Sequence, residues 1–281
     1  DPEANGRAAV RVLDSSQDPM WTFVSRDGRT LLFNNAVTGT RNLWTMPLDR
    51  GAPPSQITAI AGDNVMHSSL SPDGSRVVFA SRATGNSDIW TQNVDGSDLR
   101  QLTNDEAADS WPIWAPDGEW IVFGTIRGGR SETWRVPAAG GPAEKVVDGF
   151  FRGDWIRRPT GTGTWLVSWI GPGGVRLIDF ERQTVLWEEK LKSNASSMPM
   201  FSPDGRFISV PLQESRDRDA IWLYEAATGK SRVAVRFPEP FKILFRACWV
   251  DDGKALVVSR HQTISHIVLF DRFWVKESTQ N

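Results

Sequence analysis

The sequence is poor in cysteine, tyrosine, histidine and long apolar runs, and several of these shortages exclude a structural feature or a kind of site. A single cysteine, Cys248, rules out an intrachain disulfide, and only one tyrosine and three histidines accompany it. No run of about 18 apolar residues occurs, so we expect no membrane span in this chain. Basic residues are not in excess, with 32 Lys and Arg against 34 Asp and Glu, so we expect no nucleic-acid partner. The start at Asp1-Pro2-Glu3, without an initiator methionine, is typical of a processed protein or an excised domain.

Signals of catalysis are also sparse. No two of His67, His261 and His266 stand at the spacing of metal ligands on one helix. The Gly-x-Ser-x-Gly motif that presents a serine nucleophile is absent from the sequence. Cys248 lies in an apolar stretch and is interpreted as a small buried residue. The sequence therefore favours a binding role over an enzymatic one, with no catalytic residue, no metal and no cofactor.

Turn-forming and aromatic residues are abundant instead. The chain holds 24 glycines, 17 prolines and 14 tryptophans, which is typical of an all-β protein made of short strands. An Asp-Gly pair recurs every 43–48 residues, with Thr160-Gly161 as its degenerate copy, and each pair stands between two apolar stretches. Such a pair predicts a hairpin turn, because glycine adopts the positive φ and aspartate bonds the nearby backbone. The regular copies begin at Asp27, Asp73, Asp117, Asp204 and Asp252.

Each turn is followed by a third predicted strand with an aromatic mark and by a short fourth strand. Trp44, Trp90, Trp134 and Trp222 hold the third-strand position and are interpreted as packing between blades. A four-stranded unit of about 44 residues matches the period of a propeller blade. We therefore predict an all-β, six-bladed β-propeller of four-stranded antiparallel blades, closed by an N-terminal strand that completes the last blade. The single domain covers 1–281, with blades at 17–62, 63–108, 109–149, 150–194, 195–240 and 241–275 plus the strand 7–14.

The second unit carries a resemblance to a known family. Ser71-Pro72-Asp73-Gly74, then Asp88-Ile89-Trp90, then Leu99–Thr103 resemble in this order the TolB-like, WD-like propeller repeat. Members of that family include periplasmic scaffolds, sensor modules of bacterial regulators and kinases, propeller caps of serine peptidases, and oligogalacturonate lyases. The resemblance thus implies a periplasmic or other extracytoplasmic setting, while the cytoplasm stays open, and it leaves the role open as well.

The candidate site comes from aligning the repeats. In a propeller, the first strand of each blade lines the central channel, and the residue that enters this strand lies near one channel mouth. The two Trp, two Arg, His and Met at this position predict a pocket for an anionic or planar ligand. The alternative is that these side chains simply fill the channel. The aligned residues are Trp21, His67, Trp111, Arg152, Met198 and Arg246.

Loops between the second and third strands are expected to open near the same mouth. Three arginines among them add positive potential, which favours an anionic partner; the alternative is solvated loop charges. The loop residues are Asn34, Asn35, Arg82, Arg127, Trp169, Gln213, Arg260 and His261. A separate acidic segment, Asp105–Asp109, is interpreted as a solvated face rather than a calcium loop.

Three functions remain open from the sequence. The favoured one is a non-enzymatic binding or sensing module for a protein partner or a small anionic ligand, as part of a larger envelope or signalling protein. The alternative is a propeller-type lyase or hydrolase for an acidic sugar or peptide, which needs His67, His261 and nearby arginines to converge. A purely structural scaffold for partner proteins is the third.

Overall fold

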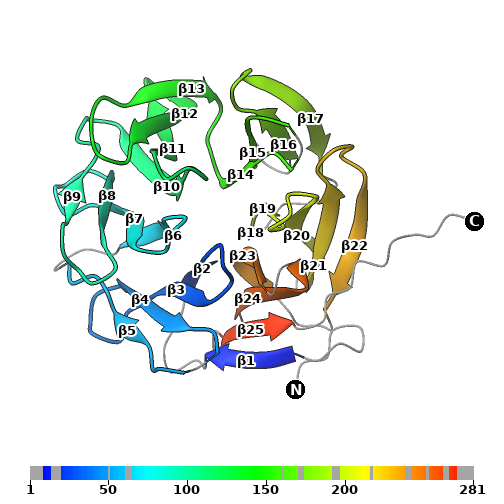
Figure 1. Ribbon diagram of the computed structural model, residues 1–281, viewed down its shortest axis with the longest axis horizontal. Coiled ribbons are helices and arrows are strands. Elements are labelled where there is room, and N and C mark those ends of the chain that lie inside the picture. Colours follow the sequence, from blue (N-terminus) through cyan, green and yellow to red (C-terminus); the bar gives the residue numbers. More distant parts are fainter. Residues whose placement is uncertain are drawn as a thin grey trace, which may run out of the picture.

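The computed structural model places short antiparallel sheets around a central axis (Figure 1). The innermost strands of the sheets contact one another in turn and close the ring. The part of the chain that the structure describes comprises residues 9–13, 20–49, 51–60, 65–159, 161–169, 174–191, 197–215, 218–237, 242–250, 253–261 and 266–270.

Five sheets have four antiparallel strands in the order of the sequence, from the axis outward. The first two sheets are β2 (Met20–Val24), β3 (Thr30–Asn35), β4 (Asn42–Pro47) and β5 (Ser55–Gln56), then β6 (Met66–Leu70), β7 (Arg76–Ser81), β8 (Asp88–Asn93) and β9 (Arg100–Gln101). The next two are β10 (Ala108–Trp114), β11 (Trp120–Arg127), β12 (Arg130–Pro137) and β13 (Glu144–Asp148), then β14 (Gly153–Arg157), β15 (Thr164–Trp169), β16 (Gly174–Asp179) and β17 (Thr184–Lys190). The fifth is β19 (Met200–Phe201), β20 (Phe207–Ser215), β21 (Arg218–Glu225) and β22 (Ser231–Arg236).

The closing sheet departs from this plan and corrects the predicted fold. It has five strands, in the order β1-β25-β24-β23-β18, so five rather than six sheets are four-stranded antiparallel blades. The N-terminal strand pairs antiparallel with β25, Ala9 opposite Phe270, and closes the ring as expected. The strands of the closing sheet are β1 (Ala9–Leu13), β18 (Ser197–Met198), β23 (Lys242–Val250), β24 (Ala255–His261) and β25 (His266–Phe270).

The extra strand β18 results from a break in the first strand of the preceding unit. Pro199 separates β18 from β19, and proline has no N–H with which to continue a ladder. As a result, Met200 and Phe201 pair with β20 of their own sheet, whereas Ser197 and Met198 pair in parallel with β23 of the next. A prediction of identical blades could not include this exchange between sheets.

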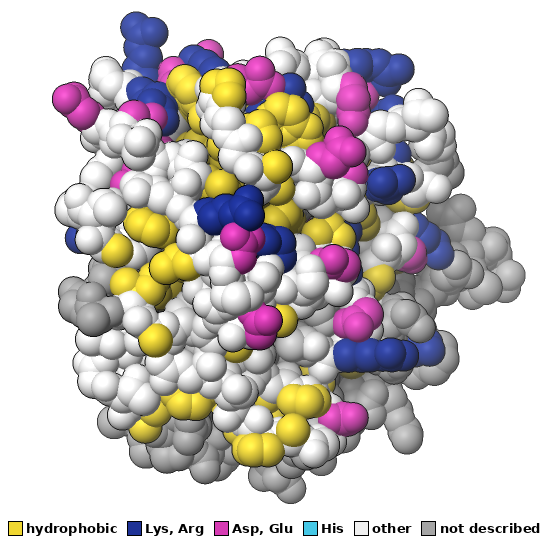
Figure 2. Space-filling model, turned by 60° about the vertical axis from the view of Figure 1, so that its left-hand side comes forward, with side chains coloured by type: hydrophobic (Ala, Val, Ile, Leu, Met, Phe, Trp, Pro, Cys, Tyr) yellow, Lys and Arg dark blue, Asp and Glu magenta, His cyan; other side chains and the backbone are white. Residues whose placement is uncertain are grey.

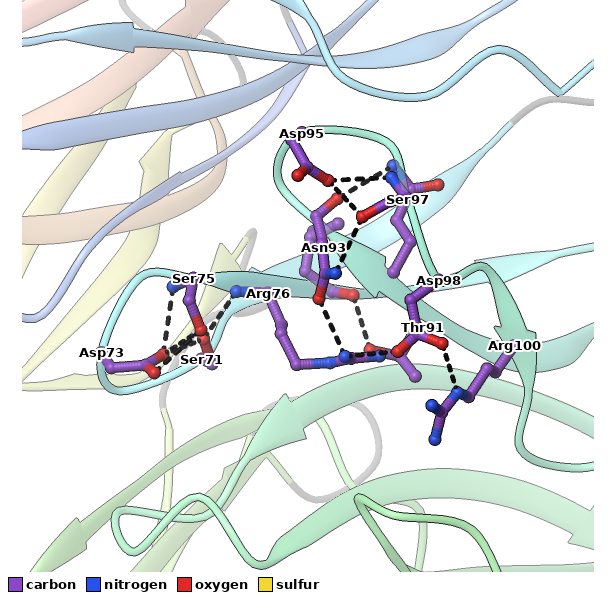
Figure 3. A network of polar contacts seen from close by, with 12 residues as sticks. Ser71, Asp73, Ser75, Arg76, Thr91, Asn93, Asp95, Ser97, Asp98 and Arg100 are labelled. Carbon is purple, nitrogen blue, oxygen red and sulfur yellow. Dashed lines mark hydrogen bonds and ion pairs between the residues drawn. The ribbon is translucent and has the colours of Figure 1, made fainter.

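The repeated Ser-Pro-Asp-Gly turn is built by its own side chains (Figure 3). The Ser71 hydroxyl donates to Asp73 Oδ1 at 2.6 Å and accepts the Arg76 N–H at 2.9 Å. The same Asp73 oxygen accepts the Ser75 N–H at 3.0 Å, and Gly74 has a φ of 72°, in the left-handed region. These bonds lower the pKa of Asp73, the Ser71 bond most of all. In this blade the serine, the aspartate and the glycine each take part in the turn that joins the first two strands.

The core lies between neighbouring sheets. Phe33, Phe79 and Phe123 occupy equivalent places in β3, β7 and β11 and are fully buried. The third-strand tryptophans, among them Trp44 and Trp134, are half-buried and pack against these clusters, which confirms their interpretation as packing residues. On the face shown in Figure 2, acidic and basic side chains are interspersed around apolar patches.

Candidate binding site at one end of the channel

Three aromatic members of the aligned set sit on β-bulges in the innermost strands. The register shifts between Met20 and Phe23, between Met66 and Ser69, and between Ser110 and Ile113. Within these shifts, Trp21, His67 and Trp111 have φ values of 43°, 49° and 58°. A left-handed conformation costs a residue with a Cβ about 1–2 kcal/mol, and such strain gathers at functional sites. The bulges thus hold one left-handed aromatic residue in each of three successive sheets, at the same level of the ring.

These side chains stack on one another. The rings of His67 and Trp111 lie nearly parallel, with centroids 3.6 Å apart and an interplanar angle of 20°. Trp21 meets His67 edge-on, with centroids 5.4 Å apart. Burial, and then the charges of Arg246 and Arg152, lower the pKa of His67 to about 3. His67 is therefore neutral near pH 7 and is a weak base.

Arg152 also contacts the Trp111 ring. Its guanidinium carbon lies 4.3 Å from the centroid of Trp111 and 4.7 Å from that of Trp169. Among the described residues, this guanidinium makes no ion pair and no hydrogen bond, and its Nε is buried without a partner. Burial lowers the pKa of Arg152. The mouth thus holds a half-buried cation whose charge is offset by aromatic faces alone.

Arg246 lies deeper and serves the fold. Its side chain is 3 % exposed, and its Nη1 donates to the Ser68 carbonyl at 3.1 Å, which joins the closing sheet to the β6–β9 sheet. Its guanidinium carbon lies 5.2 Å from the ring centroid of Phe23. Burial lowers the pKa of Arg246 to about 10, against the opposing attraction of Cys248 and Asp154. Arg246 therefore stabilises the contact between two sheets and is not open to a ligand.

The other predicted site residues are dispersed. Met198 is 1 % exposed in β18, and Arg82 is exposed directly after β7. Asn34 and Asn35 are buried at the end of β3, where Asn34 donates to the Val65 carbonyl at 3.0 Å. The expectation that these two residues lie in a loop is therefore wrong. Gln213 lies in β20 and donates to the Ser215 carbonyl at 3.0 Å. Arg260 and His261 end β24, and their side chains lie outside the described part of the chain.

The acidic segment is only partly a solvated face. Asp105 and Glu106 are exposed, but Asp109 begins the buried part of β10 and is fully buried. Arg127 lies 2.7 Å from Asp105 and 3.5 Å from Asp109 and stands over the ring of Trp134. Burial raises the pKa of Asp109 to about 6, although its hydrogen bonds and Arg127 oppose the shift. The expectation of a solvated face is therefore wrong for Asp109, and Arg127 is occupied by these carboxylates.

The single cysteine is buried, as expected. Cys248 is 2 % exposed in β23, and its thiol donates to the Thr22 carbonyl at 3.8 Å. Burial raises the pKa of the Cys248 thiol to about 11. The thiolate that a nucleophile needs is therefore disfavoured at neutral pH.

The opposite, turn-bearing end of the innermost strands contains a chamber of about 140 Å³ that the sequence did not reveal. Asp154 lines it, with a carboxylate that accepts the N–H groups of Trp155 and Phe201 at 2.8 and 2.9 Å. Burial raises the pKa of Asp154, while Arg26 lowers it. Arg26 itself donates to the Trp155 carbonyl of the β14–β17 sheet. The signal in the sequence that could have pointed to this contact is Arg26 itself, which stands where three other copies of the turn motif have proline.

Over the described ranges, no three His, Cys, Asp or Glu side chains are grouped so that they could hold a metal ion. In that same part of the chain, no helix has the length and apolar character needed to cross a membrane.

The chain matches the model of one known protein family. The model of the TolB beta propeller domain matches residues 3–162, more than half of the sequence. The chain belongs to the TolB β-propeller family. No curated protein matches it. The resemblance of the repeat motif to this family is thereby confirmed.

Solved structures agree with a TolB-type fold. TolB from Acinetobacter baumannii aligns with a TM-score of 0.63 at 16% identity, over 88% of this chain and 64% of that one. A putative TolB from Agrobacterium tumefaciens gives 0.60 at 16% identity, over 95% and 91%. An oligogalacturonate lyase in complex with manganese gives 0.65 at 14% identity, over 95% and 93%. This TolB-family chain spans less than two thirds of the Acinetobacter protein, and identities this low establish the fold alone.

Proposed function

We propose that this TolB-family propeller is a binding module that holds an acidic ligand at the channel end formed by Trp21, His67, Trp111 and Arg152. The observation that carries the proposal is the state of Arg152. Its guanidinium is half-buried over two indole rings, without an acidic or hydrogen-bonding partner among the described residues. A desolvated cation of this kind gains most from an anion that completes its hydrogen bonds.

Backbone strain supports the same location. Three neighbouring aromatic residues adopt left-handed conformations at one level of the channel, and packing alone has less demanding solutions. The bulges present flat faces next to the arginine, which suits a ligand with an acidic group and a planar or apolar part. Such a ligand is a small organic acid, an acidic sugar or a segment of a protein partner, and we place this role outside the cytoplasm.

An enzymatic role for the same site is less well supported. A lyase or hydrolase would need a base near the acidic ligand, and His67 is a poor one because burial and two arginines lower its pKa to about 3. The similarity to an oligogalacturonate lyase is one of fold at 14% identity. We therefore treat turnover as an outcome to be measured with the binding assay.

The test is binding of acidic probes to the wild-type protein and to Arg152→Met. Digalacturonate and a short peptide with a free C-terminus serve as probes, with galactobiose and the peptide amide as neutral counterparts. Loss of the charge should weaken binding of an acidic probe by about tenfold or more. The matched control is Arg100→Met, which removes an exposed arginine whose partner Asp98 also pairs with Arg76.

Three results are informative. Binding of an acidic probe that requires Arg152 but not Arg100, without new products, supports the module. Conversion of digalacturonate to an unsaturated product would show that the protein is a lyase and would contradict the proposed binding role. Equal affinity of wild type and Arg152→Met for every probe would refute the location of the site.

A further inference from the structure

The surroundings of Arg152 limit how an anion can approach it. The five N–H groups of a guanidinium lie in its own plane. Arg152 Nε is buried without a partner, whereas its two terminal nitrogens, which also make no hydrogen bond within the described part, are not buried in this way. The open donors are thus those at the Nη1–Nη2 edge. A ligand has to present acceptor atoms at this edge, in the plane of the guanidinium.

The space beside that plane is aromatic. The guanidinium lies over the rings of Trp111 and Trp169, and His67 lies against Trp111 in turn. We infer that the acidic group is a planar carboxylate, bound end-on by both terminal nitrogens of Arg152, in preference to a phosphate or a sulfate. This inference rests on the proposed function, since it names the chemistry of the ligand at the same site.

Shape favours the carboxylate. Its two oxygens are coplanar and match two parallel N–H donors. A tetrahedral anion that aligns two oxygens with this edge directs its other oxygens out of the guanidinium plane. The rings nearest the guanidinium carbon, those of Trp111 and Trp169 at 4.3 and 4.7 Å, present aromatic surface there rather than a charged donor. Those oxygens would lose water without gaining a donor, which costs free energy in a half-buried site.

Charge favours it as well. Among the side chains that the structure describes at this level, Arg152 is the cation with unused donors, because Arg246 is 3 % exposed and bonded to the Ser68 carbonyl. His67 is uncharged at neutral pH and adds no positive charge. One cation available within the described part of the chain balances a monoanion, whereas a dianion would keep an unpaired charge against aromatic side chains.

The experiment compares anions by NMR titration of the full chain labelled with ¹⁵N-arginine. The probes are N-acetylglycyl-phenylalanine, its C-terminal amide, galacturonate, galactose, inorganic phosphate and sulfate, all at one ionic strength. The Arg152 Nε–H resonance is the direct readout and is assigned by its absence in Arg152→Lys. We expect it to shift with carboxylate probes at concentrations about tenfold or more below those needed for phosphate or sulfate. The peptide and the sugar arm distinguish the two natural sources of the carboxylate.

Lysine at position 152 keeps the charge but loses the two parallel donors, so Arg152→Lys should lose most of the carboxylate binding. Arg158→Lys is the matched control, since Arg158 lies over the Trp165 ring in the same sheet but is paired with Asp179 at 3.3 Å. Thermal unfolding of both variants shows whether they are folded. Arg152→Lys is needed to assign the Arg152 resonance, but the comparison of carboxylates with phosphate and sulfate is made on the wild-type chain.

The inference and the proposed function fail in different ways. If phosphate or sulfate shifts the Arg152 resonance as readily as the carboxylates, the carboxylate inference is overturned and the acidic-ligand module stands. The same holds if Arg152→Lys binds carboxylates as well as the wild type does. If no anion shifts the resonance and Arg152→Met changes no affinity, the proposed function fails with it.

Discussion

His67 stacks on Trp111 with ring centroids 3.6 Å apart, although the two residues belong to different blades and both have left-handed backbones. The contact excludes water from one face of the imidazole and also carries the stack onward to Arg152. It therefore couples the electrostatics of His67 to the proposed ligand site. This coupling can be measured.

Replacement of Trp111 should release His67. In Trp111→Ala the imidazole regains water, so its pKa should rise from about 3 towards the ordinary value of 6.5. The lost packing should also cost about 2 kcal/mol of stability, less than for a fully buried tryptophan. NMR titration of the His67 ring protons measures the pKa, and Trp120→Ala, away from this stack, is the control. An unchanged His67 pKa would show that Trp111 does not cover the imidazole in solution.

Asp109 should make stability depend on pH in an unusual direction for a carboxylate. Because burial raises its folded-state pKa from 3.8 to about 6, the folded protein binds this proton more tightly than the unfolded chain does. Its favourable contribution is therefore full below about pH 4 and is lost as the pH rises through 6. The stability of Asp109→Asn relative to wild type should rise between pH 4 and pH 7, as measured by urea unfolding. Glu106→Gln, an exposed neighbour, is the control, and a constant difference across this range would contradict the burial of the charge.

Arg246 should affect stability before it affects binding. Arg246→Ala removes a charged hydrogen bond to the Ser68 carbonyl and leaves Asp154 without a nearby buried cation. We expect a loss of about 2 kcal/mol in the free energy of unfolding. Denaturant unfolding measures this loss, with Arg100→Ala as an exposed control. If Arg246→Ala were as stable as the wild type, its side chain would be free to serve a ligand directly.

The turn motif predicts a gain as well as a loss. Ser71→Ala removes the hydroxyl that bonds both Asp73 and the Arg76 N–H, which should cost about 1 kcal/mol. In the third blade the same position is Ala115, next to Pro116, Asp117 and Gly118. Ala115→Ser should therefore stabilise the protein by about 0.5–1 kcal/mol. Thermal unfolding of the two variants tests both signs, and a destabilising Ala115→Ser would show that the site cannot accept the hydroxyl.

Closure of the ring depends on β1. Deletion of residues 1–14 removes the strand that pairs with β25 and leaves that edge open. We expect the melting temperature to fall by more than about 5 °C, whereas deletion of residues 1–6 should change it little. Equal melting temperatures for both deletions would mean that the β1–β25 pairing adds nothing to stability.

Much of the architecture could be predicted from the sequence because it depends on local chemistry. The Asp-Gly pairs predicted the hairpins because only glycine readily adopts the positive φ seen at Gly74, Gly118 and Gly205. The alignment of first strands also placed Trp21, His67 and Trp111 at one level, since equivalent positions in a repeat share a place in the ring. The break at Pro199, which moves β18 into the closing sheet, escaped prediction because its outcome depends on a distant partner strand, in which Phe245 lies opposite Ser197.

The sequence by itself determined the repeated strands, their turns, the family and the level of the channel at which aromatic and basic side chains gather. These features follow from local backbone preferences and from a repeat of 43–48 residues, and both can be seen in the sequence alone. The tertiary structure alone decided that Arg152 lies over Trp111 and Trp169 with no acidic partner among the residues described, that Arg246 is buried and bonded to Ser68, and that Asp109 is buried. Charge, burial and partnership depend on side chains that other blades supply, and no local pattern encodes which of them will meet.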